Sequence, residues 1–115
     1  MSAFDDEMKA IRDANVADKK TQANAAIDQI CKTYQSDLKA ALAARKGNVT
    51  DAEVRYQVVG AVVGSTLSYT PEHLEAYGRL KADATATSQN ITVSWDQGND
   101  KDGVFCLNII VRYRG

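Results

Sequence analysis

Glycine and proline are both absent from the segment between Ser2 and Lys46, and Gly47 follows it directly. These residues are the commonest helix breakers, so their absence allows one continuous helix of about 67 Å. A compact domain of this chain length has a radius of gyration of only about 13 Å. The sequence therefore predicts a helix that breaks, protrudes from its domain or packs against another chain.

A surplus of charge of either sign is also missing. The formal net charge of the 115-residue chain is −1, so we expect no nucleic-acid partner. The longest apolar run, Val58 to Gly64, is far shorter than the roughly 20 residues of a membrane span, so we expect no membrane association. The chain opens without the pattern of a secretory signal, and its two cysteines are expected to be reduced thiols in the cytoplasm.

Residues that carry chemistry are few. His73 is the only histidine, and with Glu72 and Glu75 beside it, it is the best candidate for the general base of a small enzyme. Cys31 and Cys106 lie in apolar stretches, where a free cysteine behaves as a small hydrophobic residue. Their distance from each other and from His73 does not fit a zinc site. We therefore expect no cofactor and no metal, and we favour a non-catalytic function.

Start and stop signals for a helix enclose the first segment. Ser2 can cap the helix, with Asp5 three residues later, while Arg45 and Lys46 precede Gly47 at the far end. In the second half of the segment, apolar residues recur with the helical period and predict one buried face: Ile27, Ile30, Cys31, Tyr34, Leu38, Ala41 and Leu42.

The first half of the segment presents a different face. Phe4, Met8 and Ile11 lie together on a helix, but at about 100° per residue their face is rotated by roughly 120° from the later one. Weak helix formers between residues 13 and 18 allow a break near residues 15–21, whereas the surrounding alanines favour continuity. We expect a continuous helix, with residues 1–17 as a protruding arm.

The segment at residues 50–64 is open to two interpretations. Thr50 and Glu53 have the spacing of a capping box, and Val49 and Val54 that of a hydrophobic staple, which together predict a helix. The many valines and their alternation with polar residues would also suit a strand. We favour the helix because the capping pair satisfies specific backbone donors.

A third helix is predicted after Thr70. Pro71 is suited to the first helical position, because its missing N–H would have no partner there. Leu74, Tyr77, Leu80 and Ala84 then lie on one apolar face, which we expect to face the core.

The C-terminal part is predicted to be a hairpin, with a loop at residues 97–103 between strands at 91–96 and 104–114. One register pairs apolar residues of a single face: Trp95 with Phe105, Val93 with Leu107, and Ile91 with Ile109. In this register residues 111–114 have no strand opposite them. We expect the helices to cover one face, and a further strand or another chain to cover the exposed edge.

The expected fold is α+β, in a single domain of residues 1–115, with a long N-terminal helix, two further helices and a C-terminal antiparallel β-hairpin packed on them. The expected function is a non-catalytic protein–protein association module that associates with itself. One alternative is a small inhibitor or immunity-type protein that blocks a foreign protein, and another is a small enzyme that uses His73. The expected partner-binding residues come from the arm and the C-terminal strand: Phe4, Met8, Ile11, Ile110, Arg112, Tyr113 and Arg114.

Overall fold

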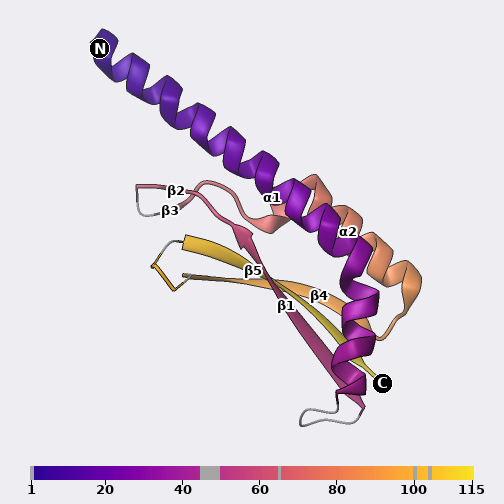
Figure 1. The fold of residues 1–115 in the computed structure, drawn as a ribbon. Coiled ribbons are helices and arrows are strands. Elements are labelled where there is room, and N and C mark those ends of the chain that lie inside the picture. Colours follow the sequence, from indigo (N-terminus) through magenta and orange to yellow (C-terminus); the bar gives the residue numbers. More distant parts are fainter. Residues whose placement is uncertain (1, 45–49, 65, 100, 104) are drawn as a thin grey trace.

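Two helices pack against one face of a three-stranded antiparallel sheet, and the first helix extends far beyond it (Figure 1). The computed structural model describes residues 2–44, 50–64, 66–99, 101–103 and 105–115. Its elements, in chain order, are α1 (Ala3–Ala43), β1 (Asp51–Val59), β2 (Val62–Val63), β3 (Thr66–Leu67), a 3₁₀ turn (Pro71–His73), α2 (Glu75–Thr87), β4 (Ile91–Asn99) and β5 (Phe105–Arg114).

The first helix is continuous, as expected, and does not break near residues 15–21. Its N-terminus is capped by Ser2, whose Oγ accepts a hydrogen bond of 3.2 Å from the backbone N–H of Asp5. The helix ends at Ala43, and the expected stop at Gly47, with Arg45 and Lys46 before it, lies outside the described residues.

Only the second half of α1 is packed into the domain. Its buried residues follow the predicted face: Ala23, Ile27, Ile30, Tyr34 and Leu38. These side chains pack with the inner face of the sheet and with α2 in one hydrophobic core. Before Ala23, Val16 alone among the side chains of α1 is partly buried, so the first five turns of the helix lie outside the hydrophobic core.

The prediction of a helix at residues 50–64 is wrong. Asp51–Val59 forms strand β1, and a short hairpin of β2 and β3 follows it. Along β1, Val54, Tyr56 and Val58 face the helices, while Glu53 and its polar neighbours two and four residues on face away. Pairing with β5 and burial of one alternating face therefore favour the strand over the helix that the capping-box spacing predicted. Val49 of the predicted hydrophobic staple lies outside the described residues.

The C-terminal hairpin forms, but its register differs from the predicted one by four residues. Trp95 is opposite Ile109 and Val93 is opposite Val111, because β4 continues to Asn99 and shortens the connection. A shift by an even number leaves every side chain on the predicted face, so the apolar face remains the inner one.

The strand order β1–β5–β4 places the last strand, β5, in the centre of the sheet. Arg114, the last residue of β5, is opposite Asp51 of β1 and also donates its backbone N–H to the carbonyl of Asn90. The prediction that residues 111–114 overhang as a free edge is therefore wrong, since β5 is the central strand. The expectation that a further strand would cover this edge is confirmed, and that strand is β1.

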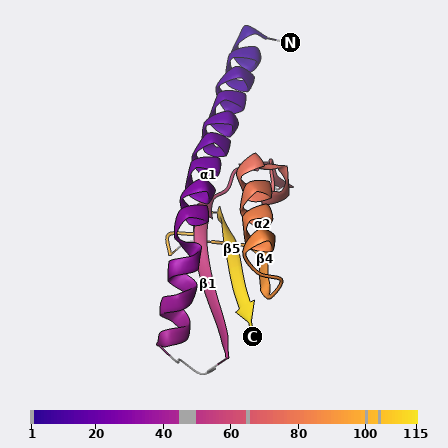
Figure 2. The ribbon, with the colours of Figure 1, turned by 90° about the vertical axis from the view of Figure 1, so that its right-hand side faces the viewer.

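The predicted third helix is present as α2, but its predicted start at Pro71 is wrong, because Pro71–His73 forms a separate 3₁₀ turn, Leu74 is extended and α2 begins at Glu75. The described residues therefore form two α-helices where we expected three. The apolar face of α2 is buried at Tyr77, Leu80 and Ala84, and Leu74, directly before the helix, is buried as well. Polar contacts tie it to α1: the Oδ1 of Asn24 accepts the N–H of Ala76 at 3.0 Å, and the hydroxyl of Tyr34 donates to Asp83 at 2.5 Å. These contacts set the two helices side by side over the sheet (Figure 2).

The resulting shape is a small two-layer body with a long rod. The molecule measures 61 × 29 × 18 Å, and its radius of gyration of 17.0 Å exceeds the roughly 13 Å of a compact chain of this length. The N-terminal end of α1 extends beyond all other elements, and the two termini lie at opposite ends of the molecule (Figures 1 and 2). Within the described residues, no helix is long and apolar enough to cross a membrane.

Candidate protein-interaction surface

The projecting part of α1, residues 3–22, carries a row of exposed apolar side chains. We call this segment the arm. Phe4, Met8 and Ile11 are 66%, 52% and 56% exposed, although they are among the largest apolar residues of the chain. They are spaced by four and three residues, which places them along one face of the helix. Three large apolar groups in line on a projecting helix are the kind of surface that marks a contact site for another protein.

A groove of about 430 Å³ runs between the arm and the core domain. One wall is the arm itself, and the other is formed by the two residues after β1, by strand β2 and by the start of β5. The lining residues are Met8, Ile11, Arg12, Asn15, Val16, Lys19, Gly60, Ala61, Val62, Val63 and Phe105. The apolar row of the arm is therefore continuous with apolar groups of the domain.

Local backbone chemistry builds the second wall of the groove. Gly60 allows the ring of Phe105 to pack against the backbone, since a Cβ at position 60 would lie 2.9 Å from Phe105 Cδ1. The backbone N–H of Ser68 donates to the carbonyl of Ala61 at 2.9 Å, which closes the β2–β3 turn. Val62 at this turn is 42% exposed, so the groove has an apolar rim on the domain side too.

The tip of the arm and the side of the arm that lines the groove carry different charges. Asp5 and Asp6 lie in its first turn, followed by Glu7, so the tip is acidic. Arg12 and Lys19 line the groove further along, so its rim is basic. Arg12 makes a 3.6 Å ion pair with its neighbour Asp13, but both side chains are more than half exposed and the pair contributes little to stability.

The four candidate residues of the C-terminal strand do not join this surface. Ile110 is 5% exposed on the outer face of the sheet, and Tyr113 packs against the core on the inner face. Arg112 is bound to Glu53, and Arg114 is at the end of the central strand. This end of the molecule is opposite the arm (Figure 1), so the structure does not bring the two predicted sets together.

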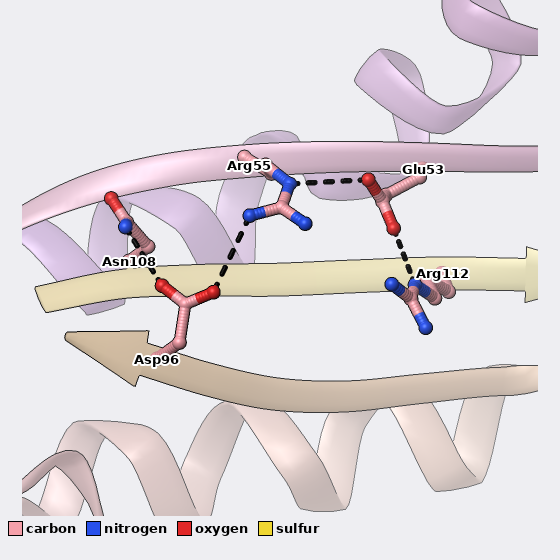
Figure 3. Close-up of polar contacts among 5 residues, drawn as sticks. All are labelled: Glu53, Arg55, Asp96, Asn108 and Arg112. Atoms are coloured by element: carbon pink, nitrogen blue, oxygen red, sulfur yellow. Dashed lines mark hydrogen bonds and ion pairs between the residues drawn. The ribbon is translucent and has the colours of Figure 1, made fainter. Parts of the chain in front are cut away.

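The outer face of the sheet holds a network of charged groups across all three strands (Figure 3). Arg55 on β1 contacts Glu53 at 3.2 Å and Asp96 on β4 at 3.4 Å, and Asp96 also accepts a 2.8 Å hydrogen bond from Asn108 on β5. Arg112 donates to the second oxygen of Glu53. The hydrogen bonds of Arg112, and then of Arg55, lower the pKa of Glu53 below its ordinary value.

This network explains why Ile110 and Cys106 are buried although they lie on the face of the sheet opposite α1 and α2. Both lie on the central strand, and polar side chains of the flanking strands extend over them. Gln57 reaches the Sγ of Cys106 at 3.3 Å, and Arg55 spans from β1 to Asp96 on β4. The charges of Arg55, Arg112, Glu53 and Asp96 balance, so these side chains stabilise strand pairing and offer no charged patch.

The remaining candidates for chemistry have structural surroundings. The Nδ1 of His73 lies 3.4 Å from the backbone N of Thr70 and 3.2 Å from its hydroxyl, a contact at a helix start. Cys31 and Cys106 are free thiols. Burial is the largest cause that raises the pKa of Cys31, with nearby Asp83 next, and a raised pKa disfavours the reactive thiolate. Among the described residues, no group of three or more His, Cys, Asp or Glu side chains could hold a metal ion.

Comparison with protein-family models, curated proteins and solved structures finds no match to this chain.

Proposed function

We propose that the protein is a non-catalytic association module that binds a second copy of itself through the arm. The proposal is supported chiefly by one observation, the exposure of Phe4, Met8 and Ile11 on a helix that projects beyond its own core. Fully burying side chains of this size contributes about 1.5–3 kcal/mol each. A row that is more than half exposed leaves much of that free energy available to a partner.

The form of the arm supports the same proposal. An isolated helix of this length is marginal in water, and neither polar side chains nor alanines can supply much packing. Within one copy the arm receives support from the rest of α1, but the side chains of its apolar row remain more than half exposed. A partner helix on that face would both bury the row and stabilise the helical form.

Removal of most of the arm, including its apolar row, tests the proposal. The buried residues of α1 begin at Ala23, so a chain without residues 1–17 keeps all of them. We therefore expect the sheet and α2 to stay folded. Its near-ultraviolet circular dichroism should match that of the full chain, while light scattering behind a sizing column should show a loss of the dimer. A full chain that elutes as a monomer at all concentrations would contradict self-association.

A matched variant tests whether the dimer contact depends on the apolar row or only on the presence of a helical arm. Replacing Phe4, Met8 and Ile11 together by glutamine keeps the length and helix propensity of the arm but removes its apolar surface. We expect this variant to behave like the truncated chain. A triple variant that still forms dimers would place the contact elsewhere on the molecule.

The expected location is the cytoplasm. Its support is chemical: Cys31 and Cys106 are both free, and free thiols persist in reducing compartments.

A further inference from the structure

The groove beside the arm has the position and charge to accept one particular occupant. Resting on the self-association proposed above, we propose that the arm of a second copy lies in this groove and runs antiparallel to the first arm. The two arms then bind each other reciprocally, with the tip of each arm at the inner end of the other copy's groove.

The apolar spacing defines the register of this pairing. Phe4, Met8, Ile11 and Asn15 follow intervals of four, three and four residues, the pattern of a two-stranded helical seam. In the antiparallel register, Met8 of one copy lies opposite Ile11 of the other. Phe4 of one copy then lies at the level of Asn15 of the other, so each of the four residues has a counterpart on the other arm.

This register brings the most exposed apolar side chain to an apolar site. Asn15 itself lines the groove, together with Val16 of the arm and with Gly60 and Phe105 of the domain. Phe4 of the second copy would lie against these groups and bury the ring that is 66% exposed in the isolated chain. An aromatic pair with Phe105 also becomes possible.

The charges favour the same direction. Asp5 and Arg12 lie on one flank of the arm, because seven residues are close to two helical turns. In the antiparallel register, Asp5 of one copy lies about 3 Å along the axis from Arg12 of the other. Lys19, also on that flank and lining the groove, lies about 7 Å from the same carboxylate along the axis. The acidic tip of each arm thus meets the basic rim of the other groove twice in each dimer.

The buried parts of the two α1 helices do not overlap in this arrangement. The buried residues of α1 begin at Ala23, and in this register that residue of one copy lies beyond the first residue of the other. With Met8 opposite Ile11, residue 3 of one arm lies opposite residue 16 of the other, so the arms face each other over residues 3–16 and the two buried cores lie toward opposite ends of the pair.

A parallel pair of arms accounts for fewer of these features. It would match Asn15 with Asn15 and place Glu7 beside Arg12 of the other copy, which are both acceptable contacts. It would, however, bring no large apolar side chain to the level of Asn15, and it would place the two acidic tips side by side. Glu7 lies on the flank away from Asp5, so the two directions predict different charge partners for Arg12.

Charge reversal in the full-length chain distinguishes the two directions. We expect Asp5→Lys and Arg12→Glu each to weaken self-association, measured by sedimentation velocity, by roughly fivefold to thirtyfold. An equimolar mixture of the two variants should associate about as tightly as wild type, because each tip then meets a rim of opposite charge. The control Glu7→Lys makes the same charge change in the same helical turn, and we expect its dissociation constant to remain within about twofold of wild type.

The outcomes separate this inference from the function on which it depends. If Glu7→Lys weakens the dimer as strongly as Asp5→Lys, or if the mixture does not recover, the arms are not antiparallel and the inference is overturned while self-association stands. If the wild-type chain is monomeric throughout, both fall. Recovery in the mixture with an unaffected Glu7→Lys supports the antiparallel pair.

Discussion

Replacing Ile11 by alanine separates the stability of the fold from the stability of the proposed dimer. Ile11 is 56% exposed in the isolated chain, so its truncation removes few contacts within one copy. Alanine is also the better helix former, so the arm should remain helical. We expect the free energy of unfolding of the monomer to change by less than about 0.5 kcal/mol.

The effect on the dimer follows from the same exposure. Isoleucine loses three carbon groups on truncation, each worth about 0.8 kcal/mol when buried. Scaled by the exposed fraction of 56%, the lost burial is about 1.3 kcal/mol in each copy. A dimer loses this twice, which raises the dissociation constant by roughly 80-fold.

A dilution series followed by sedimentation velocity measures this change, and chemical denaturation of the same samples measures the fold. Ile27→Ala is the matched control, because it makes the same substitution on the same helix at a fully buried position. It should lower the free energy of unfolding by about 2–5 kcal/mol and leave the dissociation constant of the folded protein close to that of wild type. If Ile11→Ala and wild type dissociate at the same concentration, the exposed row is not the contact.

Two further predictions concern the contacts that hold the domain together. Tyr34→Phe should lower the free energy of unfolding by about 1–3 kcal/mol, measured in urea, because the hydroxyl that donates to Asp83 is lost from a buried side chain; no loss would mean that this bond adds nothing to the α1–α2 contact. Glu53→Gln should cost about 0.2–1 kcal/mol at pH 7, because Glu53 binds two arginines at an exposed site. The folded pKa of Glu53 lies below its unfolded value, so its contribution is present above the unfolded pKa and is lost as the pH falls through the folded one. Urea titrations of wild type and Glu53→Gln should therefore converge in acid, and a difference that persists below both pKa values would contradict this origin.

Much of the fold could be predicted from periodicity in the sequence. The buried face of α1 from Ile27 to Leu38, the apolar face of α2 and the inner face of the hairpin all follow from spacing. Spacing identifies which side chains share a face, and burial of such a face is the main source of stability in each element. It does not fix how far one strand slides along another by an even number of residues, which explains the four-residue difference between Trp95 and its predicted partner.

The segment at residues 51–59 could not be predicted from local signals because two of them conflicted. Thr50 and Glu53 have the spacing of a capping pair, yet Glu53 is instead bound to Arg112 on β5. That partner is distant in the sequence, and only the sheet brings it close. The error carried over to the last strand, which appeared to be an edge because its true neighbour, β1, was interpreted as a helix.

Only one of the two walls of the groove could therefore be predicted from the sequence. The exposed row of the arm could be identified from the rotation of Phe4, Met8 and Ile11 relative to the later buried face. The opposite wall of the groove could not, because Val62 and Phe105 meet the arm only after β1 and β5 have paired. In the sequence, the basic residues of the rim are scattered among other charges. They could not be assigned to a groove, because that requires knowing which flank of the helix borders it.

The central claim is self-association, and the mass of the full-length chain in solution tests it most directly. Sedimentation equilibrium between about 1 µM and about 1 mM covers the affinities that such a short helical contact can give. The chain has a mass of 12.5 kDa, and we predict that the weight-average mass rises with concentration towards twice this value. A mass that stays at 12.5 kDa across the whole range would contradict the account.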